Sequence, residues 1–127
     1  MSNPPIPPQA HEQFTKLREI QQSLQNIANQ QSHLESEKAE TGLALEELKK
    51  AADGDTVYKN SGIILVKSSK GALISELEEK LELVNTRITV SQKQRARIEE
   101  NLKECQTKLS EMLKNIPGLN QQQQQQP

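Results

Sequence analysis

The stretch that decides the fold is DTVYKNSGIILVK, residues 55–67. Its two halves, Thr56–Lys59 and Ile63–Lys67, are rich in the β-branched and aromatic residues that favour β-strands. Between them Asn60–Gly62 suits a three-residue hairpin loop in which the glycine takes a positive φ. The pattern therefore predicts a short β-hairpin over residues 56–67.

This hairpin has more apolar surface than one chain with two thin helices can cover. Ile63–Val66 is continuously apolar rather than alternating, so both faces and both edges of the strand require cover. An isolated two-stranded hairpin is only marginally stable in water. We therefore expect the hairpin to pair with copies or relatives of itself, and the residues expected to carry this assembly are Val57, Tyr58, Gly62, Ile63, Ile64, Leu65 and Val66.

Long helical patterns flank the hairpin on both sides. Alternating steps of three and four residues from Leu17 to Ala52 give eleven positions, of which eight are apolar. The same steps from Ile74 to Ile116 give thirteen positions, of which eleven are apolar. Five or more heptads of this kind indicate a coiled-coil seam. We expect helices over 10–52 and 70–116 that fold back on each other as an antiparallel hairpin, with Ala52 level with residue 73. The pattern alone leaves a parallel dimer open.

The two ends of the chain differ from this helix/β-hairpin/helix domain, which we place at residues 10–116. Residues 1–9 are rich in proline and are expected to be extended, flexible and free of helix. Residues 117–127 contain Pro117-Gly118 and the tract Gln121–Gln126, which predicts a disordered tail of low complexity.

Composition excludes several classes of protein. The 127 residues contain only two aromatic side chains and carry a net charge of −1, which argues against a closed globular core and against a basic nucleic-acid surface. No apolar run is long enough to cross a membrane, and the first residues lack the basic and apolar regions of a secretory signal. The single Cys105 fits a reducing cytosol and is expected to be a small buried hydrophobe. We expect a cytoplasmic protein that binds neither membrane nor nucleic acid.

Catalysis has no candidate residues. A two-helix arrangement offers no concave pocket with converging groups, and no Gly-rich phosphate loop is present in the sequence. His11 and His33 have no cysteine or carboxylate at a distinctive metal-ligand spacing. We therefore expect no enzyme activity, no cofactor and no metal.

The hairpin stretch resembles the V-Y-K-x-x-G-x-x-L-[VI]-[KR] signature of beta-type prefoldin subunits, in its archaeal version. Glu76–Glu82, with the sequence ELEEKLE, is similar to the opening of that family's second helix, and the resemblance covers about Ala10 to Ile116. Alpha-type subunits carry two hairpins, for which this chain has no room. The resemblance implies a hexamer of two alpha-type and four beta-type subunits, in which the hairpins close into a double β-barrel and the coiled coils extend from it.

The implied function is that of an ATP-independent chaperone, a holdase that captures non-native proteins at the coiled-coil tips and delivers them to a group II chaperonin. Both chain ends fall at the tip of the expected helical hairpin, farthest from the β-hairpin. A client-binding tip would then contain Phe14, Leu17, Ile20, Leu109, Met112, Leu113 and Ile116. Each of these could instead be an ordinary seam residue. The alternative function is a coiled-coil scaffold or tether, which explains the heptads but not the β-hairpin.

Overall fold

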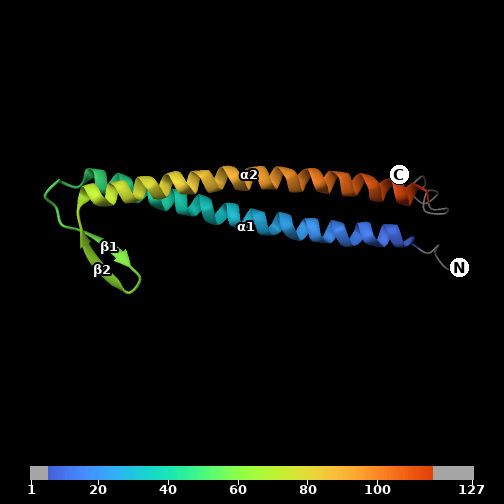
Figure 1. The fold of residues 1–127 in the computed structure, drawn as a ribbon, viewed down its shortest axis with the longest axis horizontal. Coiled ribbons are helices and arrows are strands. Elements are labelled where there is room, and N and C mark those ends of the chain that lie inside the picture. The colour runs from blue at the N-terminus through green and yellow to red at the C-terminus, as the bar shows by residue number, and fades with distance from the viewer. Residues whose placement is uncertain (1–5, 116–127) are drawn as a thin grey trace, which may run out of the picture. The chain divides into compact units, whose positions relative to one another are not determined.

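The computed structural model describes residues 6–115 of the chain. Helix α1 (Pro8–Lys50) is followed by strands β1 (Val57–Ser61) and β2 (Ile64–Ser68) and by helix α2 (Lys70–Lys114), as Figure 1 shows. The predicted fold class is confirmed, because two long helices are separated by one short antiparallel hairpin.

Contacts divide the chain into two compact units. One, here called the terminal unit, comprises Met1–Ala28 and Lys93–Pro127, of which residues 6–28 and 93–115 are described. The other, the hairpin unit, comprises Asn29–Gln92 and contains both strands together with the adjoining parts of the two helices.

The bounds of α1 differ from the predicted 10–52. The helix begins at Pro8, inside the stretch that was expected to be free of helix, and it ends at Lys50. Proline is tolerated in the first turn because the amide hydrogen it lacks would have no partner in the helix there. The Pro7 carbonyl accepts hydrogen bonds from the amides of Ala10 (3.0 Å) and His11 (3.2 Å). The expectation of an extended segment over residues 1–9 is therefore wrong for the last two of them.

Helix α2 begins at Lys70, as predicted, because Ser69 caps it. The Ser69 hydroxyl accepts a hydrogen bond from the amide of Ala72 at 3.2 Å, which satisfies one of the free donors in the first turn. The helix ends at Lys114, and Asn115 lies in a turn. The predicted end at Ile116 lies outside the described residues, as does the predicted tail.

In the terminal unit the two helices meet along the predicted seam and beyond it. Ile27, Cys105 and Leu109 are buried, and so are Ala10 and Gln13. The last two continue the three–four spacing from Leu17 toward the N-terminus. The Cys105 thiol donates a hydrogen bond to the Gln13 carbonyl at 3.4 Å, so these two residues face each other. Cys105 is buried, as expected for a small apolar seam residue.

In the hairpin unit Leu34 packs against Val84 and Ile88, and these three buried residues form the local core. The predicted register would have placed Leu34 near residue 91 and, in the terminal unit, Gln13 near residue 112. The observed partners lie three to seven residues earlier on α2. The predicted register is wrong by one to two turns, because it was set from the expected helix ends, whereas the packing of side chains between the helices selects the pairing.

The β-hairpin has a tighter turn than predicted. Ser61 pairs with Ile64, so the loop has the two residues Gly62 and Ile63, and Asn60 belongs to β1. The predicted three-residue loop at Asn60–Gly62 is therefore wrong. The predicted positive φ is confirmed, since Gly62 has a φ of 68°. A positive φ at the first of two loop residues only is the pattern of a type II′ turn, whose twist matches that of the flanking strands.

Candidate functional site

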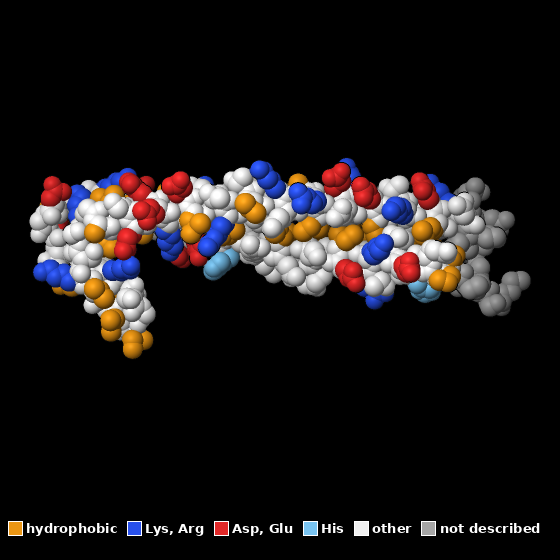
Figure 2. Space-filling model, in the orientation of Figure 1, with side chains coloured by type: hydrophobic (Ala, Val, Ile, Leu, Met, Phe, Trp, Pro, Cys, Tyr) orange, Lys and Arg blue, Asp and Glu red, His pale blue; other side chains and the backbone are white. Residues whose placement is uncertain are grey.

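The hairpin is the largest uncovered apolar feature of the hairpin unit. Ile63 at its turn is fully exposed, and Leu65 is 69% exposed. Tyr58, Ile64 and Val66 are also exposed, whereas Val57 is half-buried. Hydrophobic side chains continue along the hairpin to its end in Figure 2. Adjoining exposed apolar side chains are typical of interaction sites, so the hairpin is the candidate assembly site.

The edges of the hairpin are uncovered as well. Within residues 6–115, β1 and β2 pair only with each other, in a two-stranded antiparallel sheet. Each strand thus presents one row of backbone amide and carbonyl groups without a strand partner. Such an edge is a template for pairing with another strand. Apolar faces and free edges together are the features that the sequence predicted for an assembly element.

An ion pair connects the hairpin to α2. The Lys59 ammonium lies 3.0 Å from the Glu76 carboxylate, and both side chains are about half exposed. A half-exposed pair contributes little to stability because water screens it. Its main consequence is orientation, since Lys59 lies in the middle of β1 and Glu76 in the second turn of α2.

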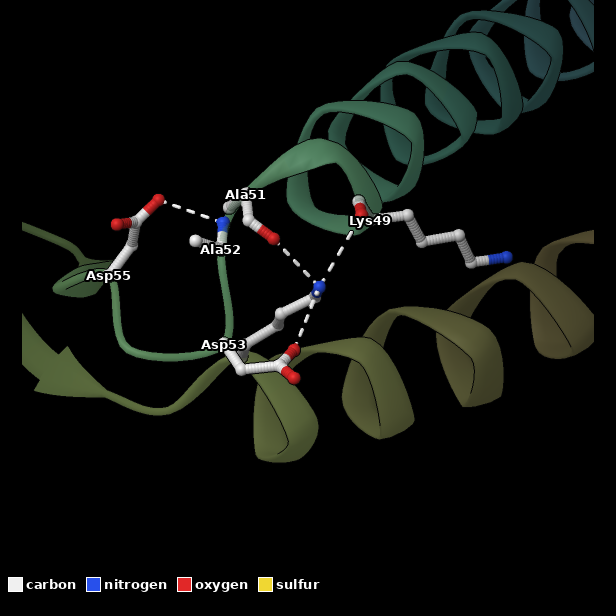
Figure 3. Close-up of polar contacts among 6 residues, drawn as sticks. Lys49, Ala51, Ala52, Asp53 and Asp55 are labelled. Atoms are coloured by element: carbon white, nitrogen blue, oxygen red, sulfur yellow. Dashed lines mark hydrogen bonds and ion pairs between the residues drawn. The ribbon is translucent and has the colours of Figure 1, made fainter.

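A lysine holds the junction where α1 ends and α2 begins. Figure 3 shows contacts from the carbonyls of Lys49 and Ala51 and from the Asp53 carboxylate that converge on one ammonium group. That group is Lys70 Nζ, which donates to the Ala51 carbonyl at 2.7 Å, to the Lys49 carbonyl at 3.3 Å and to Asp53 at 3.2 Å. Its side chain is only 19% exposed. Lys70 thus caps the carbonyl end of α1 from the start of α2, where a cation suits the helix dipole.

Sequence reasoning did not identify Lys70. A lysine after a Ser-Ser pair has no spacing that distinguishes it from the other lysines of the chain. Its partners are backbone carbonyls about 20 residues away. The same junction contains a second contact that closes the connection to β1, in which the Ala52 amide donates to the Asp55 carboxylate at 2.8 Å.

The described residues of the predicted client-binding tip all belong to the terminal unit. Leu109 is buried, and Ile116 lies outside the described residues. The other five are half-buried, namely Phe14, Leu17, Ile20, Met112 and Leu113. The seam position next to Phe14 is occupied by the buried Gln13. Phe14 on α1 and Leu113 on α2 each follow a seam residue directly, so both flank the seam rather than close it.

The described part of the chain contains no cluster of His, Cys, Asp or Glu side chains that could hold a metal ion. His33 and Glu37 lie 3.7 Å apart on α1, and such a pair is not accompanied by a third ligand among the described residues. Neither described helix has a stretch long and apolar enough to span a membrane.

Two long helices joined through one β-hairpin define a class of coiled-coil proteins with a separate two-stranded element. The family described as "Prefoldin subunit" matches residues 11–116 of the chain. The chain belongs to this prefoldin family. Membership implies a chaperone-type function, and the family is not one of enzymes.

Several curated relatives and solved structures that resemble the chain are described as beta subunits. The chain is 40% identical over 113 residues to "Prefoldin subunit beta" of Archaeoglobus fulgidus, with 89% of this chain and 97% of that protein covered. It is 35% identical over 112 residues to the subunit of the same name from Methanothrix thermoacetophila, with 88% and 93% covered. The crystal structure of the prefoldin beta subunit from Thermococcus strain KS-1 matches with a TM-score of 0.78 and 32% identity, covering 91% of this chain and all of that one. The resemblance found in the hairpin signature is confirmed.

Proposed function

We propose that this chain is the beta-type subunit of an ATP-independent holdase that captures non-native proteins through its terminal unit. The observation that carries this proposal is the position of Phe14 and Leu113 beside the seam. Both are apolar and half-buried in the folded chain. A holdase needs apolar groups that remain reachable after its own folding, because its clients expose apolar segments.

Residues on the seam itself can contribute less to client binding. Leu109 is buried, so it is satisfied within the coiled coil. Leu17, Ile20 and Met112 are half-buried and remain partly reachable. Met112 has a flexible, polarisable side chain that adapts to clients of different shape. The client surface that we propose is therefore an apolar margin along both helices, in which Phe14 and Leu113 lie beside the seam and the other half-buried residues lie on it.

The assembly that we propose uses the hairpin. Family membership implies a hetero-oligomer with alpha-type subunits, and the proposed particle contains two of these and four beta-type subunits. Free strand edges and exposed side chains such as Leu65 support this role, because pairing with neighbouring hairpins would cover both. We also propose that the captured protein passes to a group II chaperonin. A simple tether, in contrast, would leave the apolar hairpin without a purpose.

A variant of the terminal unit tests the client site. Phe14 and Leu113 are each replaced by Ser, and the purified oligomer is compared with the unmodified protein in suppressing the aggregation of a denatured client. We expect the oligomer to keep its mass and to need a several-fold higher concentration for the same protection. Adding Leu17→Ser, Met112→Ser and Ile116→Ser should remove most of the remaining activity.

Two controls separate client binding from folding. Thr107→Ala, an exposed change on the α2 surface of the same unit, should leave both mass and protection unchanged. Deletion of Asn120–Pro127, which lies outside the described residues, should also have little effect because the segment is polar. Full protection by the five-residue variant would contradict the proposed site and place the client elsewhere.

A further inference from the structure

An apolar hollow lies between β1 and the adjoining ends of the two helices in the hairpin unit. It has a volume of about 290 Å³, and its apolar lining includes Ala44, Leu48, Val57, Leu73 and Leu77. A second hollow of about 400 Å³ shares Ala44, Leu73 and Leu77 with it and is bordered by charged side chains of the hairpin and of α2. The small side chain of Ala44, which is exposed, leaves both hollows open.

The hairpin of the same chain cannot fill this space. Its most exposed apolar side chain is Ile63, in the turn. Val57, which lines the hollow, begins β1, and Ile63 follows six residues later. At about 3.3 Å per residue in a strand, the turn is roughly 20 Å from the hollow. The chain thus has an unfilled apolar hollow at the base of its hairpin and an unburied apolar side chain at the turn.

We propose that the hollow receives the hairpin turn of a second copy of this chain, with Ile63 as the inserted side chain. The inference rests on the proposed assembly through the hairpin and specifies its geometry. Val57 and Tyr58 line the hollow and also belong to β1, so the hollow is continuous with the proposed pairing edge. When two hairpins approach edge to edge in antiparallel orientation, the turn of each lies beside the base of the other.

The chemistry of the inserted segment fits an apolar hollow. Residues 60–65, with the sequence NSGIIL, carry no charge. Their entry would bury no unpaired ion, whose desolvation would oppose binding. Of the charged residues that line the two hollows, Lys59 pairs with Glu76 and Glu47 pairs with Lys50. Lys80 borders only the second hollow. Because the turn of each copy enters the hollow of the other, the contact is reciprocal about a two-fold axis and is satisfied by two copies.

Disulfide trapping tests the geometry directly. Two differently tagged copies are co-expressed with an alpha-type subunit, one carrying Ala44→Cys and the other Ile63→Cys, both with Cys105→Ala to remove the native thiol. The proposed insertion brings the two new thiols within the short distance that a disulfide requires. Mild oxidation should then join the two tags in one band. The matched control is Ala39→Cys, on the same helix and also exposed but outside the hollow, which should give no such band with Ile63→Cys.

The mass of the particle distinguishes the possible failures. An oligomer of normal mass without the Ala44–Ile63 disulfide, or with Ala44→Cys joined only to the alpha-type subunit or to a bound client, overturns the insertion and leaves the proposed function standing. A chain that forms no oligomer at all overturns both.

A second variant fills the hollow without changing any residue of the hairpin. Ala44→Phe places a large side chain at the exposed helix position that borders both hollows. We expect helical circular dichroism to be unchanged and the concentration for half-assembly to rise by at least about tenfold, since burying one aliphatic side chain is worth that factor or more. Ala39→Phe should leave assembly unchanged. Equal assembly by Ala44→Phe and Ala39→Phe would also overturn the insertion.

Discussion

Replacing Lys70 by Met should destabilise the chain through the junction between its helices. Methionine keeps most of the aliphatic stem of lysine but removes the ammonium that caps the end of α1. The carbonyls of Lys49 and Ala51 then lose their donor. We expect the helix end to fray and the connection to β1 to loosen.

The magnitude follows from the three contacts. The short 2.7 Å bond to the Ala51 carbonyl is made by a largely buried charge, and a bond of this kind contributes about 1.5–3 kcal/mol. The bond to Lys49 is longer, at 3.3 Å, and contributes less. Asp53 is 99% exposed, so its ion pair adds almost nothing. The free energy of unfolding should therefore fall by about 2 kcal/mol, which for a chain of this size lowers Tm by roughly 6–10 °C.

Thermal unfolding followed by circular dichroism at 222 nm measures this change. Protein concentration must be the same for all variants, because assembly adds to apparent stability. Asp53→Ala is the matched control, since it removes the exposed ion pair and keeps both carbonyl contacts, and it should lower Tm by no more than about 2 °C. A Lys70→Met protein as stable as the unmodified one, or an Asp53→Ala protein equally destabilised, would refute the capping role.

Three further predictions concern assembly, the turn and the seam. Leu65→Asp or Ile64→Asp should abolish the oligomer while helical circular dichroism stays largely intact, because a charge would be buried between hairpins at a cost of several kcal/mol; normal particle mass in both variants would contradict this. Gly62→Val should impair assembly more than Ser61→Ala, since a β-branched residue is strained at a φ of 68°, and size-exclusion chromatography of the two variants decides it. Ser91→Ala should raise the free energy of unfolding by about 1 kcal/mol, because in the described chain the buried Ser91 hydroxyl has no hydrogen-bond partner. Val84→Ala, at an equally buried apolar position, should instead lower it by about 1–3 kcal/mol. Thermal melts that show both variants destabilised would contradict this reasoning.

The sequence by itself determined the elements and their buried faces. Heptad spacing identified seam residues such as Val84, Ile88 and Cys105, all of which are buried. Strand composition located the hairpin, and Gly62 was recognised as the residue with positive φ. These features depend on short-range properties, namely side-chain periodicity, β-propensity and local steric limits, and each can be read within a few turns or strand residues. The continuously apolar stretch likewise predicted that the hairpin lacks partners within its own chain.

Tertiary structure decided what depends on residues far apart in the sequence. A heptad pattern is nearly unchanged when one helix slides by seven residues, so only packing could bring Gln13 to Cys105 and Leu34 to Val84. The conformational free energy of a hairpin turn changes little when the turn shifts by one residue. Pairing of Ser61 with Ile64 across the strands therefore selected the two-residue turn. The Lys70 cap and the apolar hollow beneath β1 both arise where α1, β1 and α2 meet. Their free energies come from contacts between distant segments, which no local pattern encodes.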